Sequence, residues 1–98
     1  MNKAELVERV AQRTGMSLRD ARTVIDAVFD PDPEVGLIAR ELVAGGKVAI
    51  SGFGTFEARG RKARVGRNPH TGESIDIPAT RAPAFKAGKP LKETLRKA

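Results

Sequence analysis

Residues 58–72 read ARGRKARVGRNPHTG, and this stretch says most about the fold of the chain. Five cations fall within the nine residues from Arg59 to Arg67, and the stretch contains no acidic side chain. Residues 68–72 are rich in turn formers, and residues 73–77 then alternate between polar and apolar side chains as strands do. The pattern predicts a cationic β-hairpin. Because such a hairpin is only marginally stable alone in water, we expect it to order against a partner.

Duplex DNA suits this hairpin as a partner, because cations that reach the phosphates displace condensed counterions. Pro69 at the expected tip is rigid and apolar. Minor-groove architectural proteins insert such wedges between base steps and kink the duplex. The alternative is that Pro69 only shapes the turn, as most loop prolines do. Its place at the tip of a cationic hairpin favours the wedge.

Charge is distributed unevenly along the chain, whose formal net charge is +6. Residues 1–50 hold 7 Lys and Arg against 8 Asp and Glu, whereas residues 51–98 hold 11 against 4. A near-neutral half joined to a basic half indicates a scaffold that presents a binding surface to a polyanion. A basic face kept for solubility is the alternative.

Helical patterns fill the first part of the chain. Asn2 is a good cap for a first helix, and Gly15 is a natural residue to end it. Ser17 predicts the cap of a second helix with an apolar stripe at helical spacing. Pro33 suits the first position of a new helix. A third helix, or a kinked continuation of the second, is therefore expected over residues 33–44.

The pattern changes from helix to strand at residue 47. Alternating polar and apolar side chains predict strands at residues 47–51, 55–59, 73–77 and 81–87. Phe85 is expected to face inward. A short basic helix should follow from Lys89, with Pro90 in its first turn.

Length and composition bound the class of protein. A chain of 98 residues is one domain at most and buries only a modest core, so dimerisation is expected to supply the missing burial. There is no cysteine, which excludes disulfides and thiolate metal sites and fits a reducing cytosol. The first residues lack the apolar run of a signal peptide, and no segment approaches the roughly 20 apolar residues of a membrane span. We expect a cytoplasmic protein without cofactors or membrane association.

Four parts of the sequence form a distinctive set: residues 1–6, 52–56, 83–89, and 66–73 together with 77–79. These parts resemble the HU/IHF family of bacterial histone-like DNA-binding proteins, and its HU branch in particular. The similarity covers nearly the whole chain, in order. It implies an α+β fold with a helical base and a three-stranded antiparallel sheet. It also implies a protruding two-stranded β-arm and an intertwined dimer.

On this resemblance the chain is a single HU-like domain over residues 1–98. The helical dimerisation part would span 1–46, the sheet 47–88 with the arm at about 58–80, and the C-terminal helix 89–98. Two arms of a homodimer would lie in the minor groove of double-stranded DNA and bend it with low sequence specificity. The protein would thereby compact and organise the nucleoid in the bacterial cytoplasm.

The resemblance also assigns roles to individual residues. The residues expected to bind DNA are Lys3, Arg59, Arg61, Lys62, Arg64, Arg67, Asn68, Pro69, Thr71, Arg81, Lys86 and Lys89. Pro69 is the expected intercalating wedge, and the arm residues around it would contact the backbone or the groove floor. The residues expected to hold the flanking duplex are Arg59, Arg81, Lys86 and Lys89. The aromatic core shared within the dimer is expected to consist of Phe53, Phe56 and Phe85.

The chain departs from the family pattern at two internal places. Residues 31–36 look several residues longer than the usual second-helix region, which leaves the helix boundary open. Val65 stands where a basic residue is common, so one phosphate contact is expected to be missing.

Other functions are less favoured by the sequence. It offers no nucleophile–base–orienter set and no nucleotide-binding glycine motif, so an enzyme is not expected. The lone His70 makes a poor metal site.

Sequence-specific DNA binding, as in the IHF branch, is an alternative function with the same fold. The minor groove is degenerate for direct readout, however, so we expect a preference for bent, nicked or flexible DNA. RNA binding is possible but less favoured, because there is no Tyr or Trp to stack on bases. A scaffold that binds no nucleic acid would leave the cation run unexplained.

Overall fold

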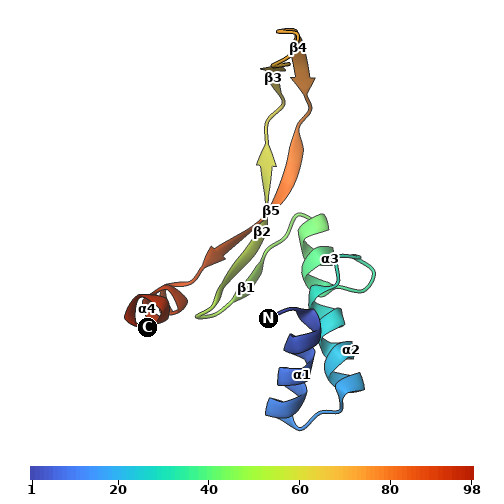
Figure 1. The fold of residues 1–98 in the computed structure, drawn as a ribbon, viewed down its shortest axis with the longest axis vertical. Helices are drawn as coiled ribbons and strands as arrows, with labels where there is room; N and C mark the ends of the chain where they lie inside the picture. The colour runs from blue at the N-terminus through green and yellow to red at the C-terminus, as the bar shows by residue number, and fades with distance from the viewer. The chain divides into compact units, whose positions relative to one another are not determined.

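The computed structural model describes residues 1–98, which separate into two compact units, Met1–Ala44 and Gly45–Ala98 (Figure 1). Helices make up the first unit, and the second holds every strand and the last helix. The elements in chain order are α1 (Lys3–Thr14), α2 (Leu18–Phe29), α3 (Leu37–Val43), β1 (Val48–Ile50), β2 (Gly54–Arg61), β3 (Arg64–Arg67), β4 (Ser74–Ile77), β5 (Thr80–Ala87) and α4 (Lys89–Lys97). The α+β class expected from the sequence is confirmed.

The first two helices begin at the caps that the sequence predicts. The side-chain oxygen of Asn2 accepts a hydrogen bond from the Glu5 N–H at 2.9 Å. The Ser17 hydroxyl accepts one from the Asp20 N–H at 3.0 Å. Each cap satisfies a backbone donor that the first turn of a helix leaves unpaired. Gly15 ends α1 with φ at 78°, a conformation that glycine adopts without strain.

The core of the first unit is small and lies between α1 and α2. Its buried residues are Val7, Ala11, Ala21 and Ile25, with Leu6 and Val10 partly buried against them. None of the large side chains of the chain is fully buried, and Leu18, Val24 and Phe29 on α2 remain exposed. Because so little apolar surface is removed from water, this core contributes little to the stability of the first unit.

The third helix begins later than the sequence predicts, at Leu37 instead of Pro33. Asp32 does close one turn, because its carbonyl accepts a hydrogen bond from the Gly36 N–H at 2.8 Å. The helix cannot continue through Gly36, whose φ of −85° and ψ of 125° are extended. Gly36 also packs so tightly on Asp30 that a Cβ there would collide with the Asp30 carbonyl. The prediction of a helix over residues 33–44 was therefore wrong in its first turn, and α3 is a separate helix.

The second unit contains one three-stranded and one two-stranded antiparallel sheet, in the orders β1-β2-β5 and β3-β4. Arg61 pairs with Thr80 at the end of the first sheet, and Arg64 pairs with Ile77 at the start of the second. The offset between the two chain segments is the same in both sheets, so they form one long hairpin in a single register. Pairing is interrupted beside Pro78, which has no N–H to donate. The expected three-stranded sheet with a two-stranded arm is confirmed (Figure 1).

The three expected core phenylalanines lie together on the three-stranded sheet. Phe56 and Phe85 are paired across β2 and β5 with ring centroids 4.9 Å apart, and the Phe53 ring lies 5.6 Å from Phe85. Gly54 leaves room for this packing, because a Cβ there would lie only 2.5 Å from the Phe85 ring. The cluster is incompletely covered, since Phe53 is 47% and Phe85 44% exposed. The phenylalanine cluster of one chain is therefore only part of a hydrophobic core.

The last helix, α4, forms where the sequence predicts it, with Pro90 at its start. The Gly88 N–H just before it donates a hydrogen bond to the Phe53 carbonyl at 2.8 Å, which ties the start of the helix to the β1–β2 turn. None of the helices has the length and apolar character that crossing a membrane requires.

Candidate nucleic-acid interface

The candidate interface is the arm, residues 58–80, which carries the cation run found in the sequence. Its four central cations are Arg61, Lys62, Arg64 and Arg67, and all are exposed. None of them forms an ion pair with a carboxylate. Their charges are therefore free to bind a polyanion without first breaking an internal pair.

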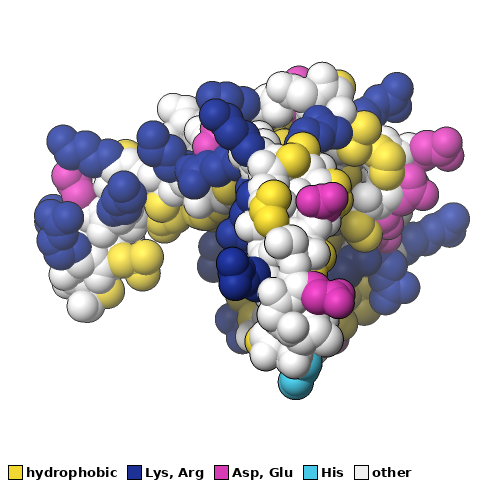
Figure 2. Space-filling model, turned by 90° about the horizontal axis from the view of Figure 1, so that it is seen from above, with side chains coloured by type: hydrophobic (Ala, Val, Ile, Leu, Met, Phe, Trp, Pro, Cys, Tyr) yellow, Lys and Arg dark blue, Asp and Glu magenta, His cyan; other side chains and the backbone are white.

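Both faces of the arm are cationic. Directly paired residues share a face in an antiparallel sheet, and successive residues alternate between faces. Arg59 and Arg61 therefore project on one face of the β2–β5 hairpin, while Arg81, paired with Gly60, projects on the other. In β3 the same alternation places Arg64 and Arg67 on opposite faces. Figure 2 colours the Lys and Arg side chains dark blue and shows many of them at the surface.

An open hollow of about 580 Å³ lies where the pairing of the two arm strands is interrupted. It is lined by Gly60, Arg61, Lys62, Ala79, Thr80 and Arg81. Three of these side chains are cations, Arg61 and Lys62 on one chain segment and Arg81 on the facing one, and the other lining residues are small. The hollow is thus open to solvent and positively charged, as a contact point for a phosphate requires.

The tip of the arm is a compact turn that presents Pro69. The Asn68 N–H donates to the Glu73 carbonyl at 2.9 Å, and the Gly72 N–H donates to the Asn68 carbonyl at 2.7 Å. Gly72 adopts φ 74°, which a residue with a Cβ would take up with strain. The Asn68 side-chain oxygen accepts a third bond, from the His70 N–H at 2.8 Å. Pro69 itself is exposed, as a wedge must be.

The remaining residues expected on the flanking duplex are all exposed in the second unit. Lys86 is paired with Thr55 and so shares a face with Arg59. Lys89 opens α4. Thr71 at the tip is also exposed, and its hydroxyl accepts a bond from the Glu73 N–H at 3.3 Å.

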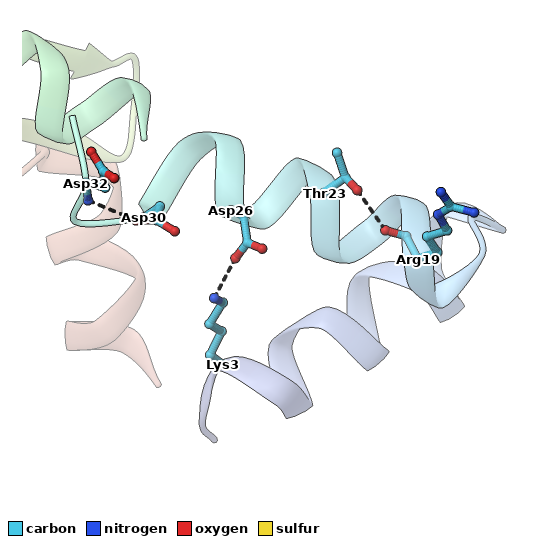
Figure 3. A network of polar contacts seen from close by, with 6 residues as sticks. All are labelled: Lys3, Arg19, Thr23, Asp26, Asp30 and Asp32. Atoms are coloured by element: carbon cyan, nitrogen blue, oxygen red, sulfur yellow. Dashed lines mark hydrogen bonds and ion pairs between the residues drawn. The ribbon is translucent and has the colours of Figure 1, made fainter. Parts of the chain in front are cut away.

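Lys3, the expected contact in the first unit, is already paired (Figure 3). Its ammonium lies 2.5 Å from Oδ1 of Asp26 on α2. This carboxylate oxygen is buried and accepts no hydrogen bond, so the ammonium is its only polar partner. Lys3 is still 61% exposed in its side chain, but it must leave Asp26 to bind a phosphate.

Sequence reasoning missed Glu57, the one carboxylate at the base of the arm. Its Oε1 accepts a hydrogen bond from Arg59 Nε at 3.1 Å, and its Oε2 lies 3.3 Å from Lys47 Nζ. One signal could have found the Arg59 contact, because Glu57 and Arg59 are two apart on one predicted strand and so share a face. The Lys47 contact follows only from the strand register of the structure, in which Lys47 comes one residue before the Val48–Phe56 pair.

The two cations hold the pKa of Glu57 below its ordinary value, chiefly through the Arg59 hydrogen bond and next through that from Lys47. A carboxyl with a depressed pKa stabilises the fold above its unfolded pKa, and this stabilisation is lost as pH falls through the folded value. Glu57→Gln should therefore remove part of the acid sensitivity. We expect the urea midpoint of wild type to fall more than that of Glu57→Gln between pH 7 and pH 3. Equal falls in both proteins would contradict this role for Glu57.

No group of three or more His, Cys, Asp or Glu side chains lies close enough to hold a metal ion. The chemistry that the second unit offers is thus a cationic arm with an apolar tip.

A basic two-stranded arm that extends from a small α+β body defines a class of architectural DNA-binding proteins. The sequence matches the family described as "Bacterial DNA-binding protein" over residues 1–96, and the chain belongs to this family. Two similar proteins are named HU. The chain is 54% identical over 96 residues to DNA-binding protein HU-1 of Halalkalibacterium halodurans, which covers 98% of this chain and 100% of that protein. It is 50% identical over 96 residues to DNA-binding protein HU of Geobacillus stearothermophilus, with coverage of 98% and 100%.

Solved structures agree with this assignment. The chain is 44% identical to HU in an Anabaena HU–DNA cocrystal structure, with a TM-score of 0.83 and 100% of both chains covered. HU from Thermotoga maritima is 32% identical, with a TM-score of 0.63 and coverage of 97% and 98%. The HU family consists of structural DNA-binding proteins associated with the nucleoid and is not a family of enzymes.

Proposed function

We propose that this chain is a histone-like architectural protein that binds duplex DNA through the minor groove with low sequence specificity and bends it. The observation that carries the proposal is the structure of the arm. Four exposed cations without carboxylate partners lie along it, and an exposed proline lies in the hydrogen-bonded turn at its tip. The cations would displace counterions from phosphates along the groove. Pro69 would enter a base step, where unstacking costs a few kcal/mol and is offset by contacts to the bent duplex.

The full set of proposed contacts extends beyond the arm. Arg59, Arg81, Lys86 and Lys89 would hold the duplex on either side of the kink. Lys3 would add a phosphate contact after leaving Asp26. The HU–DNA cocrystal structure from Anabaena, a relative of 44% identity, supports DNA as the ligand. We place the protein in the bacterial cytoplasm on the nucleoid, without enzymatic activity and without a cofactor.

The functional unit would be a homodimer. Phe53 and Phe85 are nearly half exposed, and so is Ile50, which the strand register places on the Phe85 face of the sheet. Monomeric proteins rarely leave such patches open to water. A second copy of the chain would cover this face and complete the core that each chain builds only in part. Two arms would then reach the same duplex.

The experiment that tests this function is a titration of wild type against three duplexes of roughly 30 bp. Two have unrelated sequences, and the third carries a central nick. We expect similar affinity for the unrelated duplexes, tighter binding to the nicked one, and a steep fall in affinity with salt. Binding to only one sequence would instead favour a sequence-specific protein. Absence of binding at low salt would overturn the proposal.

A further inference from the structure

Asn68 differs in burial from every other residue expected to touch DNA. Of the twelve candidates, eleven are exposed, and Asn68 alone is half-buried. Most of the polar groups of Asn68 already form hydrogen bonds within the tip. Its N–H donates to Glu73, its carbonyl accepts from Gly72, and its side-chain oxygen accepts from His70. Of these polar groups, only the side-chain NH₂ is left to donate to a ligand.

These bonds surround Pro69 on both sides. The bond from the His70 N–H to the Asn68 side chain, 2.8 Å long, spans the proline. Asparagine favours such local turns, in which the side chain bonds the backbone two residues on. Because the proline ring already fixes φ of Pro69, this additional bond restricts the direction in which the ring projects from the arm.

We propose that Asn68 is a positioning residue, which acts on DNA by holding Pro69 in its wedge orientation and not by contacting the groove floor. This inference rests on the proposed DNA-bending function. A wedge that is ordered before binding loses less conformational entropy when it enters the base step. Loss of the Asn68 bond should therefore reduce bending more than it reduces binding, because binding depends chiefly on the arm cations.

The test uses three variants that separate the acceptor oxygen from the amide NH₂ group. Asn68→Ala removes both. Asn68→Ser and Asn68→Asp keep an oxygen that can accept the His70 N–H bond, and both lack the NH₂ group. Two quantities are measured for each variant. The first is hydrogen-exchange protection of the His70 amide in the free protein. The second is the bend of an end-labelled duplex at saturating protein, so that the charge of aspartate does not alter occupancy.

We expect the bend to follow His70 protection across the variants. Asn68→Ala should lose about three- to ten-fold in protection, the range set by one such hydrogen bond, and should bend DNA less than wild type. Serine and aspartate should recover both properties to the same degree. The inference would be overturned by a variant with a protected His70 amide that bends as poorly as alanine, since that result would assign the NH₂ group to DNA contact. An unprotected variant with full bending would overturn it equally. If wild type itself fails to bend the duplex, the proposed function fails instead.

Discussion

Replacing Arg61, Arg64 and Arg67 together by glutamine should lower the affinity for duplex DNA by about two to three orders of magnitude for each arm that binds, at about 0.1 M salt. These side chains are exposed and form no ion pair, so each can displace a counterion on binding. In the homodimer each arm loses three phosphate contacts, so the slope of log affinity against log salt should fall by nearly three per arm, or about five in all. Fluorescence anisotropy over a range of salt concentrations measures both quantities.

A matched control removes the same charge from the first unit. Arg9, Arg13 and Arg22 are exposed on α1 and α2 and form no ion pair. Their triple replacement by glutamine should leave the slope nearly unchanged. If both triple variants weaken binding equally, net charge and not the arm governs affinity, and the interface assigned here is wrong.

Phe85→Ala should cost about 3–5 kcal/mol in the free energy of unfolding, the usual loss for a buried phenylalanine. A loss of this size needs a fully buried ring. In a single chain Phe85 contacts two other rings but is 44% exposed, so one chain alone does not bury it enough. The full cost therefore requires a second copy to cover the ring. Urea unfolding measured at two protein concentrations gives the loss and shows whether the midpoint depends on concentration, as it must for a dimer.

Val65→Ala on the arm is the control for this measurement. Val65 is 69% exposed, so its truncation should change stability by no more than about 0.5 kcal/mol. A concentration-independent midpoint in wild type, together with a small effect of Phe85→Ala, would contradict the dimer.

Local signals in the sequence predicted much of the fold. Asn2 and Ser17 cap their helices as expected, because a cap depends on residues only a few positions apart. The arm was predicted from its charge and turn residues, and its strands pair in one register. The start of α3 was predicted wrongly, since it depends on how Gly36 packs against the Asp30 backbone. Periodicity carries no information about such contacts.

In the candidate site, too, features visible along the chain could be predicted, whereas contacts between different helices or strands could not. The cation run of the arm could be found from the sequence, because unbalanced charge is visible along the chain, and its cations are exposed in the structure. The pairing of Lys47 with Glu57 was missed, since it joins two strands across a sheet whose register the sequence does not state. The pairing of Lys3 with Asp26 was missed for a similar reason, because it joins two helices.

The central claim is that the arm bends DNA through Pro69, and the most direct test compares wild type with Pro69→Ala. A duplex of roughly 30 bp, labelled at both ends, reports the bend by energy transfer, and anisotropy on the same duplex reports binding. We predict that Pro69→Ala binds within a few-fold of wild type, because the cations remain, but brings the ends together far less. Unchanged bending by Pro69→Ala would contradict the account and leave the proline as a turn former only.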